Sequence, residues 1–419
     1  MLVFIILWTF FQAISAENPL KFPSSKEYKI LHLTDLHYCQ SPSLDQQTSK
    51  LQNDLIEYVQ PNIVVVTGDI ISAKSYQGQP NYFKDCWRKF VQPFIDNNVY
   101  YALALGSDDL NAGAELKDII NFEKSQKLSL YKTGSQNSQD FVYYLPIESS
   151  GNSKNIAANI WLFNSHAKGD CGQDRNSWGC VDANQIKWYG EKSKLLKNIH
   201  GSNVHHLAFL HTPLPEFKKL YNDLEFYGTR NQRIGCPLLN TGLFSAFENN
   251  KDVTGVFVGH DHYNDFGGLI NGIELSYGRV TGYGGDDGPL NYARGARVIV
   301  LKETIASGTS EKRIERSHFV VTENLQDARH RFELNTEKIY LLRTGFKQDV
   351  CRVADTEESI VISLILMMTA GLIITLVSIA FNQLINKKWI VEFQKKERRG
   401  DSSKPTKIER IPSTSEFMV

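Results

Sequence analysis

The stretch KILHLTDLH, which runs from Lys29 to His37, decides the fold that we predict for this chain. Its first part, Lys29 to Thr34, is an apolar run typical of a buried strand, and Asp35 and His37 follow at its end. Alternate residues of an extended chain point the same way, so this carboxylate and this imidazole can reach the same ion. The stretch therefore predicts a strand that presents two metal ligands at its carboxyl end.

Three later apolar runs end in side chains of the same two kinds. These runs and their ends are Ile63 to Thr67 with Gly68-Asp69, Leu207 to His211 with Thr212-Pro213 after it, and Val253 to Gly259 with His260-Asp261-His262. Further candidate strands are Tyr100 to Ala104, Ile160 to Asn164 and Arg297 to Leu301, and an amphipathic helix is expected from Leu44 to Tyr58. Strands that alternate with helical stretches indicate an α/β fold whose sheets are covered by helices.

The polar ends of these strands predict a metal site. In open α/β sheets, ligands bind outside the carboxyl ends of the strands, where the loops meet. Asp and His together suit first-row divalent metals, and a carboxylate such as Asp69 can bridge two of them. Each motif alone has a simple structural explanation, because Gly and Asp form turns and a His at a strand end can bond a carbonyl group. Four motifs in order, each directly after an apolar strand, are hard to explain by turns.

The two ends of the chain predict export and a membrane anchor. Leu2 to Phe11 is apolar and is followed by the small residues of Ala13 to Ala16, which is typical of a cleaved signal peptide; an uncleaved anchor and a buried first strand are the alternatives. Ile360 to Phe381 contains no charged residue and is long enough to span a bilayer as a helix. Basic residues follow it, which places the C-terminus in the cytosol and the N-terminal part outside.

We therefore expect a single-pass type I membrane protein with an extracellular or luminal ectodomain. The expected divisions are a signal peptide (1–16), the folded domain (17–305), an extension or stalk (306–358), a transmembrane helix (359–385) and a basic cytosolic tail (386–419). The 46 Lys and Arg residues equal the 46 Asp and Glu residues, which argues against nucleic acid as the main partner. The membrane is the partner that the sequence does predict.

The cysteines fit an oxidising compartment. All six lie on the expected exported side, where disulfides persist. Cys171 and Cys180 flank the loop from Gly172 to Gly179, and we predict that they form a bridge. The pairing of the other four cannot be deduced from the sequence.

The order of these motifs resembles that of the calcineurin-like metallophosphoesterases, which carry D-x-H, G-D, G-N-H-D/E, H and G-H-x-H in sequence. Within that superfamily the chain is similar to the purple-acid-phosphatase-like branch over about Tyr28 to Leu301. The matching segments are His211 to Phe217, Gly259 to Phe266, Tyr277 to Arg279 and Thr281 to Gly285. The resemblance implies a four-layer αββα sandwich around a dinuclear metal centre.

The resemblance also implies a role for each ligand. The first metal would be bound by Asp35, His37 and His262, the second by His211 and His260, and Asp69 would bridge the two ions. The ions would be Fe, Zn or Mn, and the sequence leaves their identity open. The implied reaction is hydrolysis of a phosphoester substrate by in-line attack of a metal-activated water.

The chain departs from the family pattern at two places. Where the family has Gly-Asn-His-Asp, this chain has Gly106-Ser107-Asp108-Asp109. Ser107 is at most a weak metal ligand. Asp108 can replace the missing Asn as a ligand or act as a general acid, and Asp108 and Asp109 are the candidate catalytic residues. Ser72 stands where purple phosphatases have a Tyr, so no iron–tyrosinate colour is expected.

Two classes of function remain open at this point. The complete set of the other ligands favours a metal-dependent phosphoester hydrolase. The altered motif at Ser107 and Asp108 favours a degenerate ectodomain that uses the same fold as a binding or adhesion module. Arg279 and the loop from Gly282 to Gly288 are candidate substrate-side elements, with ordinary turn formation as the alternative for the glycines. The sequence does not identify the substrate.

Overall fold

The computed structural model describes residues 20–325, apart from residues 133–134, 138–139, 152–154, 173, 202–203, 224, 286–291 and 306–311, and then 332–333, 351 and isolated positions after 374. It divides the chain into two units, Met1–Ala354 and Asp355–Val419. The expected signal peptide lies outside the described residues, as do residues 359–385 apart from four isolated positions. Within the described part, none of the helices has the length and apolar character needed to cross a membrane.

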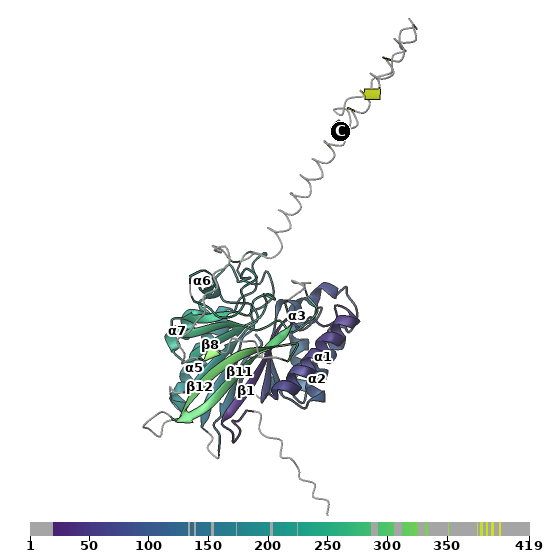
Figure 1. Cartoon of the computed structure of the whole chain (residues 1–419). Coiled ribbons are helices and arrows are strands. Elements are labelled where there is room, and N and C mark those ends of the chain that lie inside the picture. Colours follow the sequence, from purple (N-terminus) through teal and green to yellow (C-terminus); the bar gives the residue numbers. More distant parts are fainter. Residues whose placement is uncertain are drawn as a thin grey trace, which may run out of the picture. The chain divides into compact units, whose positions relative to one another are not determined.

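The first unit contains a sheet with the strand order β13-β12-β11-β1-β2-β3 (Figure 1). Strands β1, β2 and β3 are parallel, and the other neighbours pair antiparallel. The bounds are β1 Glu27–Leu33, β2 Ile63–Thr67, β3 Tyr101–Ala104, β11 Gly295–Ile305, β12 Lys312–Thr322 and β13 Phe332–Glu333. The parallel strands therefore bring the ends of β1 and β2 to one edge of this sheet.

A second sheet has the strand order β4-β5-β6-β7-β8-β10-β9. Its central strands β6, β7, β8 and β10 are parallel. The bounds are β4 Ser135–Asn137, β5 Val142–Glu148, β6 Ile156–Leu162, β7 His205–Phe209, β8 Val253–Val258, β9 Gly267–Ile270 and β10 Ile273–Tyr277. The two sheets meet through ring contacts of His32 in β1 with Phe209 and Phe257 of the second sheet.

Helices cover the sheets. Apolar residues of α1 (Pro42–Val59) and α2 (Tyr82–Asp96) share a core with the first sheet, and those of α5 (Ala183–His200) and α7 (Leu243–Asn250) share one with the second. Ser41 caps α1 by accepting the N–H of Leu44, and Pro42 occupies its first turn. The remaining elements are η1 Ala73–Ser75, α3 Ser107–Asn111, α4 Leu116–Ser125, η2 Leu130–Lys132 and α6 Glu216–Asp223. The expected α/β sandwich, with two mixed sheets, is confirmed.

Strand β12 corrects the expected end of the domain. Residues 306–358 were expected to form an extension or stalk, but β12 pairs with β11 along its whole length, from Gly295↔Thr322 to Ile305↔Lys312. Its charges suggested a stalk, yet Arg316 is buried and forms an ion pair of 2.6 Å with the fully buried Glu274 of β10. The strand therefore belongs to the sandwich, because it pairs with β11 and its Arg316 forms an ion pair inside the sandwich.

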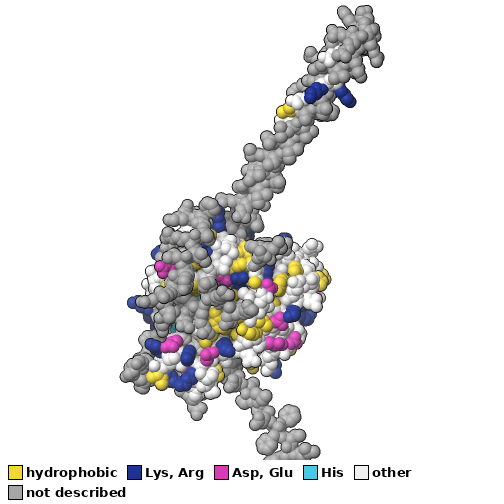
Figure 2. All heavy atoms as spheres, viewed as in Figure 1, with side chains coloured by type: hydrophobic (Ala, Val, Ile, Leu, Met, Phe, Trp, Pro, Cys, Tyr) yellow, Lys and Arg dark blue, Asp and Glu magenta, His cyan; other side chains and the backbone are white. Residues whose placement is uncertain are grey.

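Three disulfides link the six cysteines. The expected bridge Cys171–Cys180 is present, and the others are Cys39–Cys86 and Cys236–Cys351. Three disulfides in one domain are typical of secreted and luminal proteins. On the face drawn in Figure 2, the described basic and acidic side chains are interspersed.

A buried histidine in β7 leads to a prediction about stability and pH. His206 is 2% exposed, and Trp161 donates its indole N–H to Nδ1 of His206 at 3.0 Å. Burial lowers the pKa of His206 to about 4, with Asp252 opposing and Lys197 reinforcing this effect. The unfolded chain takes up the proton near pH 6.5, so His206 favours the folded state above pH 6.5, and this contribution is lost as the pH falls toward 4.

We therefore expect the difference in unfolding free energy between the wild type and His206→Gln to shrink by about 3 kcal/mol between pH 7 and pH 4. Urea unfolding of both proteins at several pH values measures this difference. Titrating groups that lie away from His206 are common to both proteins and cancel. A difference that stays constant with pH would contradict the prediction.

Candidate metal centre

The predicted ligands lie in the loops that directly follow β1, β2, β7 and β8. Several of them have backbone conformations that residues other than glycine rarely adopt: φ is 54° at Asp35, 45° at His37, 47° at Asp69 and 78° at His260. Such conformations are held by the surrounding structure and cluster at functional sites. The local backbone thus turns these side chains toward one point.

The glycine before Asp69 is required by close packing. Gly68 has φ +73°, and a Cβ at this position would lie 2.3 Å from the backbone N of Gly106. A Cβ on Gly106 would in turn lie 2.3 Å from Oδ1 of Asp69. The Gly-Asp step and the Gly106-Ser107-Asp108-Asp109 segment are therefore pressed together at the centre.

The first group of candidate ligands consists of Asp35, His37 and His262, which are all buried. Nε2 of His37 lies 3.2 Å from Nε2 of His262, and Nε2 of His262 lies 3.6 Å from Oδ1 of Asp35. Two imidazoles bound tetrahedrally to one ion at about 2.0–2.1 Å have their nitrogens about 3.3 Å apart. The spacing of this group therefore fits ligands of a single ion.

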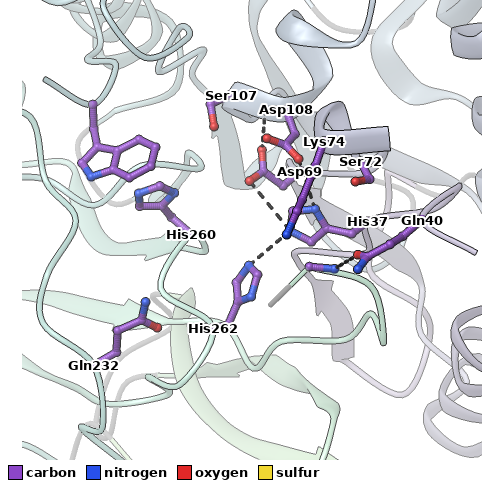
Figure 3. A pocket seen from close by; sticks show the side chains of 12 residues that line it. His37, Gln40, Asp69, Ser72, Lys74, Ser107, Asp108, Gln232, His260 and His262 are labelled. Carbon is purple, nitrogen blue, oxygen red and sulfur yellow. Dashed lines mark hydrogen bonds and ion pairs between the residues drawn. The ribbon is translucent and has the colours of Figure 1, made fainter. Parts of the chain in front are cut away.

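The second group consists of Asp69, His211 and His260. Nε2 of His211 lies 3.2 Å from Oδ2 of Asp69 and 3.2 Å from Nδ1 of His260. The same Asp69 oxygen is 3.9 Å from Nε2 of His37 in the first group. Asp69 thus lies within reach of both groups and could serve as a bridging carboxylate; Figure 3 shows it beside His37 and Asp108.

Neighbouring groups orient the candidate ligands. Both oxygens of Asp35 accept the backbone N–H of His260 at 3.1 Å, and Oδ2 also accepts the hydroxyl of Thr34. Nδ1 of His211 lies 2.8 Å from the carbonyl oxygen of Thr67. A carbonyl only accepts, so Nδ1 carries the proton and Nε2 is left to bind an ion.

The charges of the site favour cations. Burial opposes a charge on His211, but Asp69 outweighs it and raises the pKa of His211 to about 10. Burial likewise opposes a charge on His37, but Asp108 and the other carboxylates raise its pKa to about 9. The carboxylates therefore hold positive charge on the imidazoles in the metal-free protein. Bound ions would take the place of these protons, so the residues present fit a pair of metal ions.

Asp108 lies on the side of the first group. Its backbone N–H donates to Oδ1 of Asp69 at 2.9 Å. Its Oδ2 lies 3.3 Å from Nδ1 of His37 and accepts the N–H of Ala73 at 3.0 Å. It forms a third candidate group with His37 and Asp69, not with His211 and His260. Asp108 therefore lies beside His37 of the first ligand group, and its expected role as a ligand or general acid stays a prediction.

Asp109 and Arg279 do not line the pocket at the candidate ligands. Asp109 is fully buried, and its carboxylate accepts the N–H groups of Ile70 at 2.8 Å and Gly106 at 2.9 Å. Burial raises its pKa to about 7, and the negative charge of Asp69 adds to this effect. Arg279 is paired with Asp265 at 2.6 Å. These contacts tie both side chains to neighbouring loops, and their expected catalytic and substrate-side roles stay predictions.

The pocket has a volume of about 200 Å³. Ser72, Ser107 and Asp108 line it together with several of the candidate ligands. Four further lining residues were not predicted from the sequence: Gln40, Lys74, Trp178 and Gln232. The ring of Trp178 stands edge-on to His260 with centroids 4.2 Å apart. Trp178 lies inside the Cys171–Cys180 loop, so the predicted disulfide is the sequence feature that could have drawn attention to this residue.

The fold and the paired ligand groups define an α/β metallophosphoesterase sandwich. The sequence family described as calcineurin-like phosphoesterase matches residues 28–264, more than half of the chain. The chain therefore belongs to the calcineurin-like phosphoesterase family.

Its similarity to plant proteins is distant but extensive. The chain is 27% identical to "Probable inactive purple acid phosphatase 14" of Arabidopsis thaliana, over 67% of this chain and 76% of that protein. It is 26% identical to "Probable inactive purple acid phosphatase 29" of the same plant, over 69% of this chain and 80% of that protein.

Among solved structures, a dimetal phosphatase from Danio rerio is 12% identical with a TM-score of 0.45, covering 71% of this chain and 99% of that one. GAP50, the anchor in the inner membrane complex of Plasmodium, is 12% identical with a TM-score of 0.46, covering 75% and 90%.

Proposed function

We propose that this protein is a metal-dependent phosphoester hydrolase. The observation that carries the proposal is the spacing of the ligand atoms in two adjacent groups, with 3.2 Å between the imidazole nitrogens in each group and Asp69 of the second group 3.9 Å from His37 of the first. Family membership supports the same class of reaction.

Bound ions would supply Lewis-acid activation of a water and neutralise charge on the phosphoryl group. The chain's own residues prepare the site for them. Thr34 and the backbone of His260 fix both oxygens of Asp35, and Thr67 fixes the tautomer of His211. Asp108 lies against Nδ1 of His37, so it can orient this ring with Nε2 toward the ion. This preorganisation is what a hydrolytic site of this kind requires.

We also propose that the enzyme is a single-pass membrane protein whose ectodomain is extracellular or luminal. The three disulfides support an oxidising compartment. The uncharged run from Ile360 to Phe381, with basic residues after it, supports the anchor and its orientation.

A degenerate site is the second candidate. The second ligand group contains three residues, and Ser107 stands where the resemblance places an Asn ligand. Two plant relatives also carry the word "inactive" in their names. In this case the fold would serve as a binding module in the same compartment.

Metal analysis and hydrolysis on one preparation distinguish the candidates. We expect the detergent-solubilised full chain to hold up to two ions by elemental analysis. We also expect it to hydrolyse an aryl phosphate in the presence of Mn²⁺ or Zn²⁺, and to lose this activity with a chelator. A preparation that holds both ions and has no activity over roughly pH 4 to 8 would establish the degenerate candidate instead.

A further inference from the structure

We propose that Lys74 binds the phosphoryl group of the substrate and supplies the positive charge that the altered motif lacks. The proposal rests on the proposed hydrolase function. The family pattern places an imidazole where this chain has Asp108, and a carboxylate there repels an anionic substrate. A positively charged side chain elsewhere in the pocket would offset this repulsion.

Lys74 is the only Lys or Arg among the described residues that line the pocket. Its side chain is exposed, and no ion pair ties it to a carboxylate in the described part of the chain. Figure 3 shows it on the same side of the pocket as Asp69, Asp108 and His37, across from His260 and Gln232. Its ammonium group is thus available to an anion that enters the site.

The turn that carries Lys74 is held rigidly at the pocket. The N–H of Ala73 donates to Oδ2 of Asp108 at 3.0 Å, and the N–H of Ser72 donates to the carbonyl of Tyr38 at 2.9 Å. The hydroxyl of Tyr82 donates to the carbonyl of Ser72 at 2.6 Å. The backbone directly before Lys74 is therefore anchored at Ser72 and Ala73, while the Lys74 side chain stays exposed and can meet a ligand.

Asp108 has a defined part in this arrangement. Its carboxylate accepts the N–H of the residue directly before Lys74, which an imidazole with both nitrogens engaged would not do. The residue that replaces the family imidazole therefore anchors the turn that brings in the new cation. A lysine is suited to this position because a compact ammonium binds phosphate as a point charge.

The test compares Lys74→Met and Lys74→Arg with the control Lys84→Met, all in the full chain loaded with Mn²⁺. Lys84 is another exposed lysine, and it lines a different cavity beside α2. The probes are inorganic phosphate, measured by calorimetry, and hydrolysis of an aryl phosphate. We expect Lys74→Met to weaken phosphate binding by about 10- to 100-fold, the usual effect of losing a charge-assisted contact. Lys74→Arg should retain most of the binding, and the bound metal should stay constant.

The outcomes separate this inference from the proposed function. If the wild type binds and hydrolyses phosphate esters but Lys74→Met behaves like Lys84→Met, the role of Lys74 is wrong and the hydrolase stands. If the wild type holds both ions and neither binds phosphate nor hydrolyses the ester, the hydrolase is wrong and the role of Lys74 fails with it. A loss of metal in Lys74→Met would also overturn the role, because the residue would then act on the ions.

Discussion

Asp69→Asn should deprive the protein of most of its bound metal and of its activity. Asp69 is the residue that both ligand groups approach, at 3.2 Å from His211 and 3.9 Å from His37. An amide is a weaker ligand than a carboxylate and leaves the positive charges of two ions without a shared anion. Loss of residues that only support a metal ligand costs about 10- to 100-fold in affinity, so loss of the bridge should exceed 100-fold.

Elemental analysis after dialysis, followed by an aryl phosphate assay, checks this expectation. Asp45→Asn is a matched control, because Asp45 is also a buried carboxylate but pairs with Lys89 at 2.7 Å and does not line the pocket. The control should keep both its metal and its activity. Two ions per chain in Asp69→Asn would contradict the assignment of the bridge.

Ser107→Asn together with Asp108→His should raise the rate. The asparagine adds a ligand beside the second group, which consists of three candidate ligands in the structure. The imidazole adds a group that can donate a proton to the leaving oxygen or, when protonated, stabilise negative charge in the transition state. General acid assistance is typically worth ~10²–10⁴-fold. We therefore expect tighter binding of the second ion and a rate gain of this order on an aryl phosphate.

The single substitutions separate the two effects. Ser107→Asn should improve only the affinity for the second ion, which metal titration measures. Asp108→His also removes the acceptor of the Ala73 N–H, so alone it should lower stability by about 1–3 kcal/mol. An inactive wild type that the double substitution activates would identify the natural protein as a degenerate phosphoesterase. No change in metal affinity or rate would show that Ser107 and Asp108 do not limit the site.

The sequence predicted the ligand groups because strand geometry is regular. The loops after β1, β2, β7 and β8 collect at one place, and the apolar runs show where each strand stops. Other features depend on contacts between distant segments. Asp109 looks like Asp108 in the sequence, but three-dimensional packing buries it against the backbone of Ile70 and Gly106.

The residues that the sequence did not reveal have no repeating pattern. Lys74 lies in the short helix η1, and Trp178 lies in the loop closed by the Cys171–Cys180 disulfide. Neither segment has a hydrophobic periodicity or a motif that would mark a pocket residue. Strand β12 was missed because Arg316 looks solvated until its partner Glu274 is known. The bridges Cys39–Cys86 and Cys236–Cys351 likewise join segments that only the fold brings together.

The bridge from Cys236 to Cys351 affects how the domain could be shed by proteolysis. It ties the chain to the sandwich only a few residues before Ala354, where the first unit ends. A protease that cuts anywhere between residues 326 and 350 would leave the two fragments covalently joined, so the cut would not release the domain from the rest of the chain. Release would require a cut beyond Cys351 or a reductant as well as a protease. This disulfide therefore keeps the sandwich covalently joined to the C-terminal part of the chain after such a cut.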